Sequence, residues 1–250
     1  MRKISILIFS FCLFIAFSCK KTQPVVSTEY QITGSVDTSY NGKTVYLYDF
    51  DTRRNLDSVK VDSGKVVFKG TVDTLRLCRI DLGNQQRSSF ILEPGNITLD
   101  FENRRPSGTV LNDDFAKYLN TITDMDKKGY ENYMKLKESV KDPEELSHIS
   151  DSIYKNEWKP IYKKYIDSVL VANANNPIAM AIMDGIAMMY DVEEMDSVFS
   201  KLGKDVLATQ SVKKAMEVND VLKKTAVGQK FTDFTIEQKD GTKTSLSDYA

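Results

Sequence analysis

The chain has 250 residues, which is enough for one or two domains of ordinary size. Its composition, 41% hydrophobic and 28% charged, is typical of a globular protein and not of a disordered one. The 34 Lys and Arg residues balance 35 Asp and Glu residues, for a net charge of −1, so the charge gives no support for a nucleic-acid partner.

The N-terminus has the features of a secretory signal. The basic residues Arg2 and Lys3 precede an apolar run from Ile4 to Phe17, and the small residue Ser18 follows. The run is shorter than the about 20 residues that a membrane-spanning helix needs. We therefore predict that residues 1–18 are a signal peptide that is removed, and not a retained transmembrane anchor.

The end of this segment, Ala16-Phe17-Ser18-Cys19, resembles a bacterial lipoprotein lipobox, with Ala16 where Leu is commoner. The resemblance implies that Cys19 is lipidated and that residues 19–29 form a tether. Because two or more acyl chains anchor a protein stably, the membrane would be a lasting partner. The expected location is the cell envelope, on the periplasmic side of the outer membrane. The alternative is an ordinary signal peptide that leaves Cys19 as a free thiol.

Cys78 would then be the one unmodified cysteine of the mature chain, because Cys12 leaves with the signal. No intrachain disulfide can form. Alternation along the strand-like segment places Cys78 on the same apolar face as Ile80 and Leu82. Since a reactive thiol needs exposure and basic neighbours, we predict core packing for Cys78 and no redox role.

Residues 30–103 have the pattern of a β-rich domain, with short alternating or β-branched segments between turn signals such as Asn41-Gly42 and Pro94-Gly95. An antiparallel meander folded into a small sandwich is expected, with one face of each sheet on a core. The predicted strands are Tyr30–Val36, Thr44–Phe50, Ser58–Val61, Lys65–Phe68, Leu77–Leu82, Ser88–Leu92 and Asn96–Phe101.

Residues 104–226 have helical spacing of their apolar positions. Asn112 or Asp113 can cap a first helix that begins near Phe115, and the longest helical segment runs from Glu144 to about Val171. The later elements are a buried helix at Ile178–Tyr190 that follows Asn175-Asn176-Pro177, a helix to about Leu202 with a capping box of Asp191 and Glu194, and a last helix at Ser211–Lys224.

The C-terminal segment 227–250 contains Val227-Gly228, Asp233-Phe234, Asp240-Gly241 and Ser245-Leu246-Ser247-Asp248-Tyr249. This order resembles the first hairpin of a thioredoxin-like domain in the peroxiredoxin and thiol-disulfide oxidoreductase families, although Thr232 stands where Pro is common. The resemblance implies a truncated start of such a domain. The alternative is an amphipathic hairpin without that kinship. A hairpin without its sheet is marginal, so we expect Phe231–Ala250 to be mobile or loosely docked.

The motifs Phe90–Leu99 (FILEPGNITL) and Ser107–Asp113 (SGTVLND) resemble the N-terminal domain of unknown function that precedes thioredoxin-like domains in lipoproteins of Bacteroidetes. The whole chain is then α+β: a β-sandwich-like domain, a helical region and the first thioredoxin-like hairpin. The resemblance implies the architecture of an envelope thiol-disulfide oxidoreductase. Such an enzyme needs two neighbouring cysteines, and the chain has no Cys-x-x-Cys.

Two hypotheses about function follow. The chain is the accessory N-terminal part of a lipid-anchored thiol-disulfide oxidoreductase, or it is a stand-alone, non-catalytic lipoprotein that binds a protein or ligand in the envelope. We assign no catalytic residue, no cofactor site and no metal site, and the one modified residue that we expect is Cys19. Whether the complete protein is an enzyme is left open at this stage.

Other conspicuous residues have structural explanations. His148, the only histidine, is expected on a solvated helix surface. The acidic pairs Asp113/Asp114 and Glu193/Glu194 are expected at the starts of helices, where carboxylates favour the helix dipole. The aromatic residues Tyr154, Trp158, Tyr162 and Tyr165 share a helical face, which is either packed in the core or a docking strip for a partner or a glycan. Gap-filling in a core explains the methionines Met180, Met183, Met188 and Met189 better than copper binding does.

Overall fold

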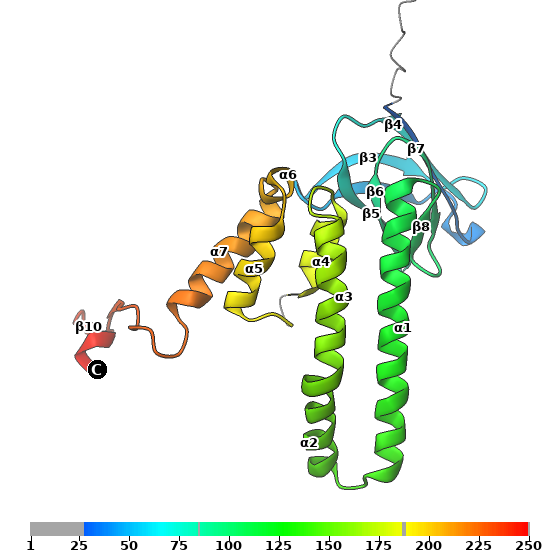
Figure 1. Cartoon of the computed structure of the whole chain (residues 1–250). Helices are drawn as coiled ribbons and strands as arrows, with labels where there is room; N and C mark the ends of the chain where they lie inside the picture. The colour runs from blue at the N-terminus through cyan, green and yellow to red at the C-terminus, as the bar shows by residue number, and fades with distance from the viewer. Residues whose placement is uncertain (1–27, 85, 187–188, 250) are drawn as a thin grey trace, which may run out of the picture.

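The computed structural model describes residues 28–84, 86–186 and 189–249 (Figure 1). The predicted signal peptide, Cys12, the lipidation site Cys19 and Met188 lie outside the described residues. Within the described part, no helix combines the length and the apolar character that crossing a bilayer requires.

The fold is α+β, as predicted, with two four-stranded sheets followed by helices. All seven predicted strands are confirmed, and the short β8 was not predicted. The first sheet has the order β4-β1-β7-β8, with bounds Lys65–Thr71, Glu29–Ser35, Gly95–Asp100 and Arg105–Ser107. The second sheet has the order β3-β2-β5-β6, with bounds Arg54–Lys60, Thr44–Asp49, Arg76–Gly83 and Gln86–Leu92.

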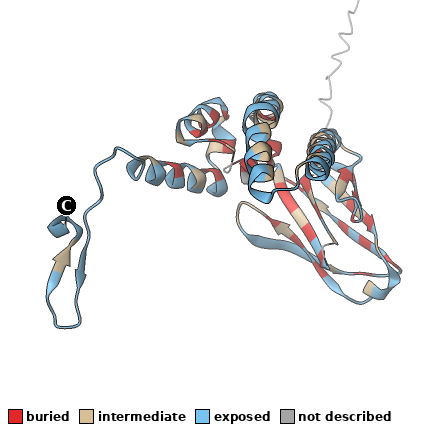
Figure 2. Cartoon of the chain, turned by 90° about the horizontal axis from the view of Figure 1, so that it is seen from below, coloured by how far each residue is buried: buried red, intermediate tan, exposed pale blue. Residues whose placement is uncertain are grey.

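The two sheets form a sandwich around a shared hydrophobic core, and Figure 2 shows buried positions alternating along the strands. Alternate side chains of each strand point inward, as the period of two requires. The fully buried members include Ile32, Phe68 and Ile97 from one sheet and Leu47, Ile80 and Phe90 from the other.

The predicted antiparallel meander is wrong in two respects. β1 lies between β4 and β7 and pairs in parallel with β7, with Ile32 opposite Ile97. The chain also passes between the two sheets instead of adding each strand beside the last one. Alternation of apolar residues fixes the face that a strand buries, but it carries no information about which strand becomes its neighbour.

Two long helical segments lie side by side as a hairpin that extends away from the sandwich (Figure 1). The first is α1, Val110–Ser139. The second consists of α2 (Pro143–Ile153), a turn of π-helix at Tyr154–Trp158, and α3 (Lys159–Ala172). The predicted helical segment Glu144–Val171 is therefore confirmed, but it is not the longest, because α1 is an uninterrupted helix of 30 residues. The Asp142 side chain caps α2 by accepting a hydrogen bond from the Glu145 backbone N–H at 2.8 Å.

The predicted start of the first helix is wrong, because α1 begins five residues before Phe115 and Thr109 occupies the N-cap. Asn112 and Asp113 therefore lie in the first turn and do not cap it. The Asn112 side chain is instead buried against β6, where its amide accepts from the Ile91 N–H at 2.9 Å and donates to the Ile91 carbonyl at 2.8 Å.

The cap of α1 comes from the sandwich. Glu93, which follows β6, accepts hydrogen bonds on one carboxylate oxygen from the Thr109 hydroxyl at 2.6 Å and from the backbone N–H groups of Leu111 at 2.9 Å and Asn112 at 3.1 Å. A carboxylate at this end of a helix also favours the helix dipole. A residue 16 positions before the N-cap therefore fixes where the helix begins, which local sequence could not show.

The remaining helices cover one side of the molecule and share a second hydrophobic core with α3 and with Leu77 and Ile91 of the sandwich. The buried helix and the capping box of Asp191 and Glu194 are confirmed, with mutual hydrogen bonds of 2.8 and 2.9 Å. The short α6 was not predicted. These helices are α4 (Ile178–Ile186), α5 (Val192–Lys201), α6 (Lys204–Leu207) and α7 (Gln210–Lys224).

The C-terminal segment forms a hairpin of β9 (Thr235–Glu237) and β10 (Lys243–Ser245), followed by a 3-10 turn at Leu246–Tyr249. It lies apart from the helices in both views, and residues 227–243 are all exposed (Figures 1 and 2). The Asp233 carboxylate closes the hairpin by accepting from the Ser247 N–H at 2.9 Å and hydroxyl at 2.7 Å. The hairpin is present, and its kinship to thioredoxin-like domains stays a prediction.

Candidate functional site

Cys78 lies inside the sandwich and is fully buried. Burial raises the pKa of its thiol, and the nearby Asp49 carboxylate adds to the shift. Both effects disfavour the thiolate, which is the reactive form of cysteine. The prediction that Cys78 packs in the core is confirmed.

Three other predictions can be checked in the described part of the chain. His148 is exposed on α2, as expected. The predicted acidic residues also lie at helix starts. Asp113 accepts from the Gly108 N–H at 2.9 Å at the start of α1. Glu194 belongs to the capping box of α5 and also pairs with Lys163. Two of the predicted packing methionines, Met180 and Met183, are buried.

A cavity with a volume of about 600 Å³ lies between the two long helical segments. We call it the aromatic groove. Its wall on the side of α1 includes Tyr118, Ile122, Tyr130 and Tyr133, and its opposite wall includes Tyr154, Trp158 and Tyr162. This size is in the range of cavities that bind small molecules or short segments of a partner.

Two alternatives, core packing or a docking strip, were predicted for the four aromatic residues of the second helical segment, and each alternative holds for some of them. Tyr165 packs against Tyr118, with nearly parallel rings 6.2 Å apart. Tyr154, Trp158 and Tyr162 line the groove, and Tyr154 is 49% exposed. The strip is therefore partly core and partly an open surface.

On α1, the groove residues recur at steps of three and four and so lie on one face of the helix. Sequence analysis did not single out Tyr118, Tyr130 or Tyr133. Their helical spacing was visible in the sequence. The groove itself was not, because the residues that line it from the second helical segment lie 17 or more positions away from these three tyrosines.

Two glycines widen the groove. Gly129 lies in the middle of α1, where glycine costs about 1 kcal/mol relative to alanine. A Cβ at Gly129 or at Gly185 of α4 would meet no other atom within 4 Å, so neither position is forced by a close contact. Both residues line the groove, and the missing side chains leave room in it.

The π-helical turn at Tyr154–Trp158 interrupts the second helical segment beside the groove. Such turns are rare and are found frequently at functional sites. Tyr154 and Trp158, its first and last residues, both line the groove. The irregular backbone therefore occurs where two of the aromatic side chains face the cavity.

The polar groups that line the groove include carboxylates, tyrosine hydroxyls, the Asn132 amide and the Trp158 indole N–H. The Tyr162 hydroxyl donates to the Asp126 carboxylate at 2.7 Å, and burial together with this hydrogen bond raises the pKa of Tyr162. Burial raises the pKa of Tyr118 to about 12. The charged side chains that line the groove within the described part are Asp126 and Asp151, and both are acidic.

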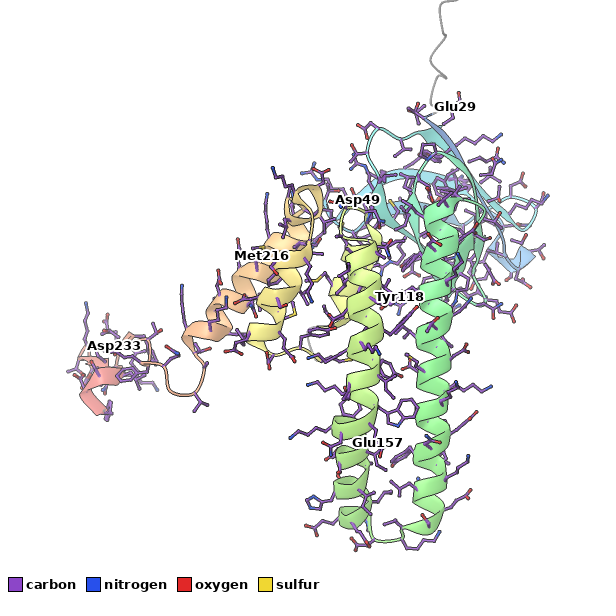
Figure 3. The ribbon with its side chains drawn as sticks, in the orientation of Figure 1. Glu29, Asp49, Tyr118, Glu157, Met216 and Asp233 are labelled. Carbon is purple, nitrogen blue, oxygen red and sulfur yellow. The ribbon has the colours of Figure 1, made fainter. Side chains whose placement is uncertain are left out.

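Figure 3 shows Tyr118 between α1 and α3, at the end of the groove that is nearest to the sandwich. It stacks between Phe115 and Tyr165, with ring centroids 6.3 and 6.2 Å away. At Tyr118 the rings pack against one another, whereas Tyr130 and Tyr133 of the same groove are 65% and 41% exposed. The groove offers apolar rings with hydrogen-bonding rims, which suits binding more than catalysis.

Residues 30–115 match the family model described as a domain of unknown function (DUF4369). The matched segment covers the sandwich and the first turns of α1, including Glu93 and Asn112. The match confirms the predicted resemblance to a domain of unknown function, while the lipoprotein and thioredoxin-like context stays a prediction. No curated protein and no solved structure is significantly similar to the chain.

Proposed function

We propose that the chain is the accessory N-terminal part of a lipid-anchored thiol-disulfide oxidoreductase of the cell envelope, and that it binds a segment of a partner protein in the aromatic groove. The groove carries the proposal, because it combines half-exposed aromatic rings, two glycines and a π-helical turn at one place. The buried Cys78 supports a binding role instead of thiol chemistry in this part of the protein.

The aromatic rings suit a polypeptide segment with apolar side chains. Tyrosine and tryptophan offer large apolar faces and a polar edge, which is why they are enriched where proteins bind one another. An unfolded or extended segment exposes such side chains, and its backbone N–H groups can donate to Asp126 and Asp151 at the rim. In this proposal the thioredoxin-like part would act on a substrate that the groove holds.

Trp158 makes the proposal testable by fluorescence, since it is the only tryptophan of the chain and lines the groove. Titration with a reduced, alkylated and unfolded protein should change its emission in a saturable way. Gly129→Leu, which fills the groove from α1, should weaken this binding about tenfold, or about 1.4 kcal/mol. Lys128→Leu is the control, because Lys128 is exposed on α1 and does not line the groove.

A saturable change that Gly129→Leu leaves intact would refute the groove as the binding surface.

The stand-alone binding lipoprotein is the second candidate, because the groove supports binding in either case. The intact mass of the protein from its native membrane distinguishes the two. A larger species with a Cys-x-x-Cys site supports the oxidoreductase, and a lipidated species that ends at Ala250 supports the stand-alone lipoprotein. Cys19→Ser should release either one from the membrane.

A further inference from the structure

A second cavity, of about 540 Å³, lies on the outer face of the sheet β3-β2-β5-β6, where α1 and α4 approach it. We call it the arginine pocket. No Asp or Glu is among the described residues that line it. The arginines that line it are Arg53, Arg79, Arg87, Arg104 and Arg105.

None of these five arginines forms an ion pair within 4.0 Å in the part of the chain that the structure describes. Arg105 is fixed by hydrogen bonds to the side chains of Asn120 at 2.6 Å and Thr123 at 2.7 Å, so it joins β8 to α1. In contrast, Arg76 of β5 has a structural role, since it pairs with the buried Asp49 at 3.1 Å and with Asp73. The pocket thus gathers positive charge without the carboxylate partners that Arg76 has.

Arg79 is the central member. Its guanidinium lies over the rings of Tyr48 and Phe50, 5.5 and 5.0 Å from their centroids. Its Nε is buried and has no hydrogen-bond partner among the described residues. A buried donor of a charged group is costly to leave unpaired, so an acceptor oxygen from a ligand would stabilise this arrangement.

Two other arginines hold unusual backbone conformations at the turns around the pocket. Arg53 has φ 56° and Arg104 has φ 58°, in the left-handed region that favours glycine or asparagine. Arg53 precedes β3 and Arg104 precedes β8, so both belong to strand connections. The turn geometry would favour glycine or asparagine at both positions, so it does not explain why each position carries an arginine.

The chemistry of the pocket favours an anion with an apolar body. Guanidinium forks match the oxygens of phosphate with paired hydrogen bonds, and a phosphate ester carries about −1.5 to −2 charges at pH 7. Phe50, Phe115 and Met180 supply an apolar wall beside the charges. The volume is in the range of small-molecule sites.

We propose that the arginine pocket binds a phosphate monoester or diphosphate of an organic molecule, with its phosphate among Arg53, Arg79 and Arg87 and its body against the apolar wall. The phosphate belongs either to a free metabolite or to a lipid headgroup. The proposal is independent of the function proposed for the aromatic groove, although Tyr118 and Ile122 line both cavities.

Calorimetric titration of the purified protein with phenyl phosphate at low salt tests this site, because the probe has both a phosphate and an apolar ring. The double variant Arg53→Gln/Arg87→Gln changes two exposed side chains and should weaken binding about tenfold or more. Arg54→Gln is the matched control, since Arg54 is the exposed neighbour of Arg53 and does not line the pocket. It should change the affinity less than twofold, and added salt should weaken binding of the unchanged protein.

Arg79→Gln should abolish binding, and circular dichroism checks that each variant is folded. If Arg79→Gln does not fold, the double variant alone decides the outcome. Absence of binding to phenyl phosphate and to phosphatidic acid vesicles would overturn the proposal, and so would an equal loss in Arg54→Gln.

Further titrations identify the source of the phosphate. Binding to vesicles with phosphatidic acid, but neither to pure phosphatidylcholine vesicles nor to phenyl phosphate, would keep the site and assign the phosphate to a lipid headgroup. Binding to phenyl phosphate in solution would assign it to a soluble ester. Tighter binding of succinate than of phenyl phosphate would reject phosphate as the ligand chemistry.

Discussion

Replacement of Glu93 by alanine should destabilise the junction between the sandwich and the helical hairpin. One carboxylate oxygen of Glu93 accepts from the Thr109 hydroxyl and from the N–H groups of Leu111 and Asn112, and the residue is only 8% exposed. In Glu93→Ala, these donors remain at a buried helix end without an acceptor.

The size of the effect follows from two contributions. Loss of a helix cap costs about 1 kcal/mol, and each buried donor without a partner costs about 1–3 kcal/mol. Because water can reach part of the site after truncation, we expect Glu93→Ala to lower the free energy of unfolding by about 3 kcal/mol. Glu93→Gln keeps an acceptor oxygen and loses the charge near the helix dipole, so its cost should be about 1 kcal/mol.

Urea unfolding followed by circular dichroism measures these changes, with the slope of the transition as a check that the same surface unfolds. Glu102→Ala is the control, because Glu102 is an exposed residue of the sandwich, and it should change stability by less than about 0.5 kcal/mol. A loss below about 1 kcal/mol in Glu93→Ala, or equal losses in Glu93→Ala and Glu93→Gln, would refute the assigned role of this carboxylate as the cap of α1.

Four further outcomes are expected. Gly129→Ala should raise the free energy of unfolding by about 1 kcal/mol, because Gly129 is a helix-interior glycine with free space around it, and a lower melting temperature would contradict this. Cys78 should resist alkylation in the folded protein and react after unfolding in urea, as read by peptide mass. Burial raises the pKa of Tyr118 to about 12, so its contribution to stability is fully present below the ordinary tyrosine pKa of about 10 and is lost as the pH rises toward about 12; absorbance titration at 295 nm should therefore lose one component that titrates near pH 12 in Tyr118→Phe. Amides of residues 231–249 should exchange with solvent far faster than those of the sandwich, and strong protection there would show that the hairpin docks firmly.

Patterns within a few residues gave most of the secondary structure. The capping box of Asp191 and Glu194 was predicted because its two partners are three positions apart, and the burial of Cys78 followed from alternation within one strand. The exposed position of His148 was also predictable from its polar helical neighbours. In each case the interacting groups are close in the chain, so that the sequence contains both.

The errors and omissions involve partners that are distant in the chain. Asn112 or Asp113 was expected to cap α1, whereas Glu93 does so and Asn112 binds the backbone of β6. The parallel pairing of β1 with β7 joins segments about 65 residues apart. Only one wall of the aromatic groove was predicted. The helical spacing indicated the face that contains Trp158, but the opposite face of α1 was not predicted.

The sequence by itself determined the position of most strands and helices and the faces that they bury, since the periods of 2 and 3.6 residues are properties of the local backbone. It also showed that this chain has no Cys-x-x-Cys pair. Only the tertiary structure decided the order of the strands, the cap supplied by Glu93 and the convergence of arginines from residues 53 to 105 on one pocket. The physical reason is that strand pairing and helix packing bring together groups whose separation along the chain has no fixed period.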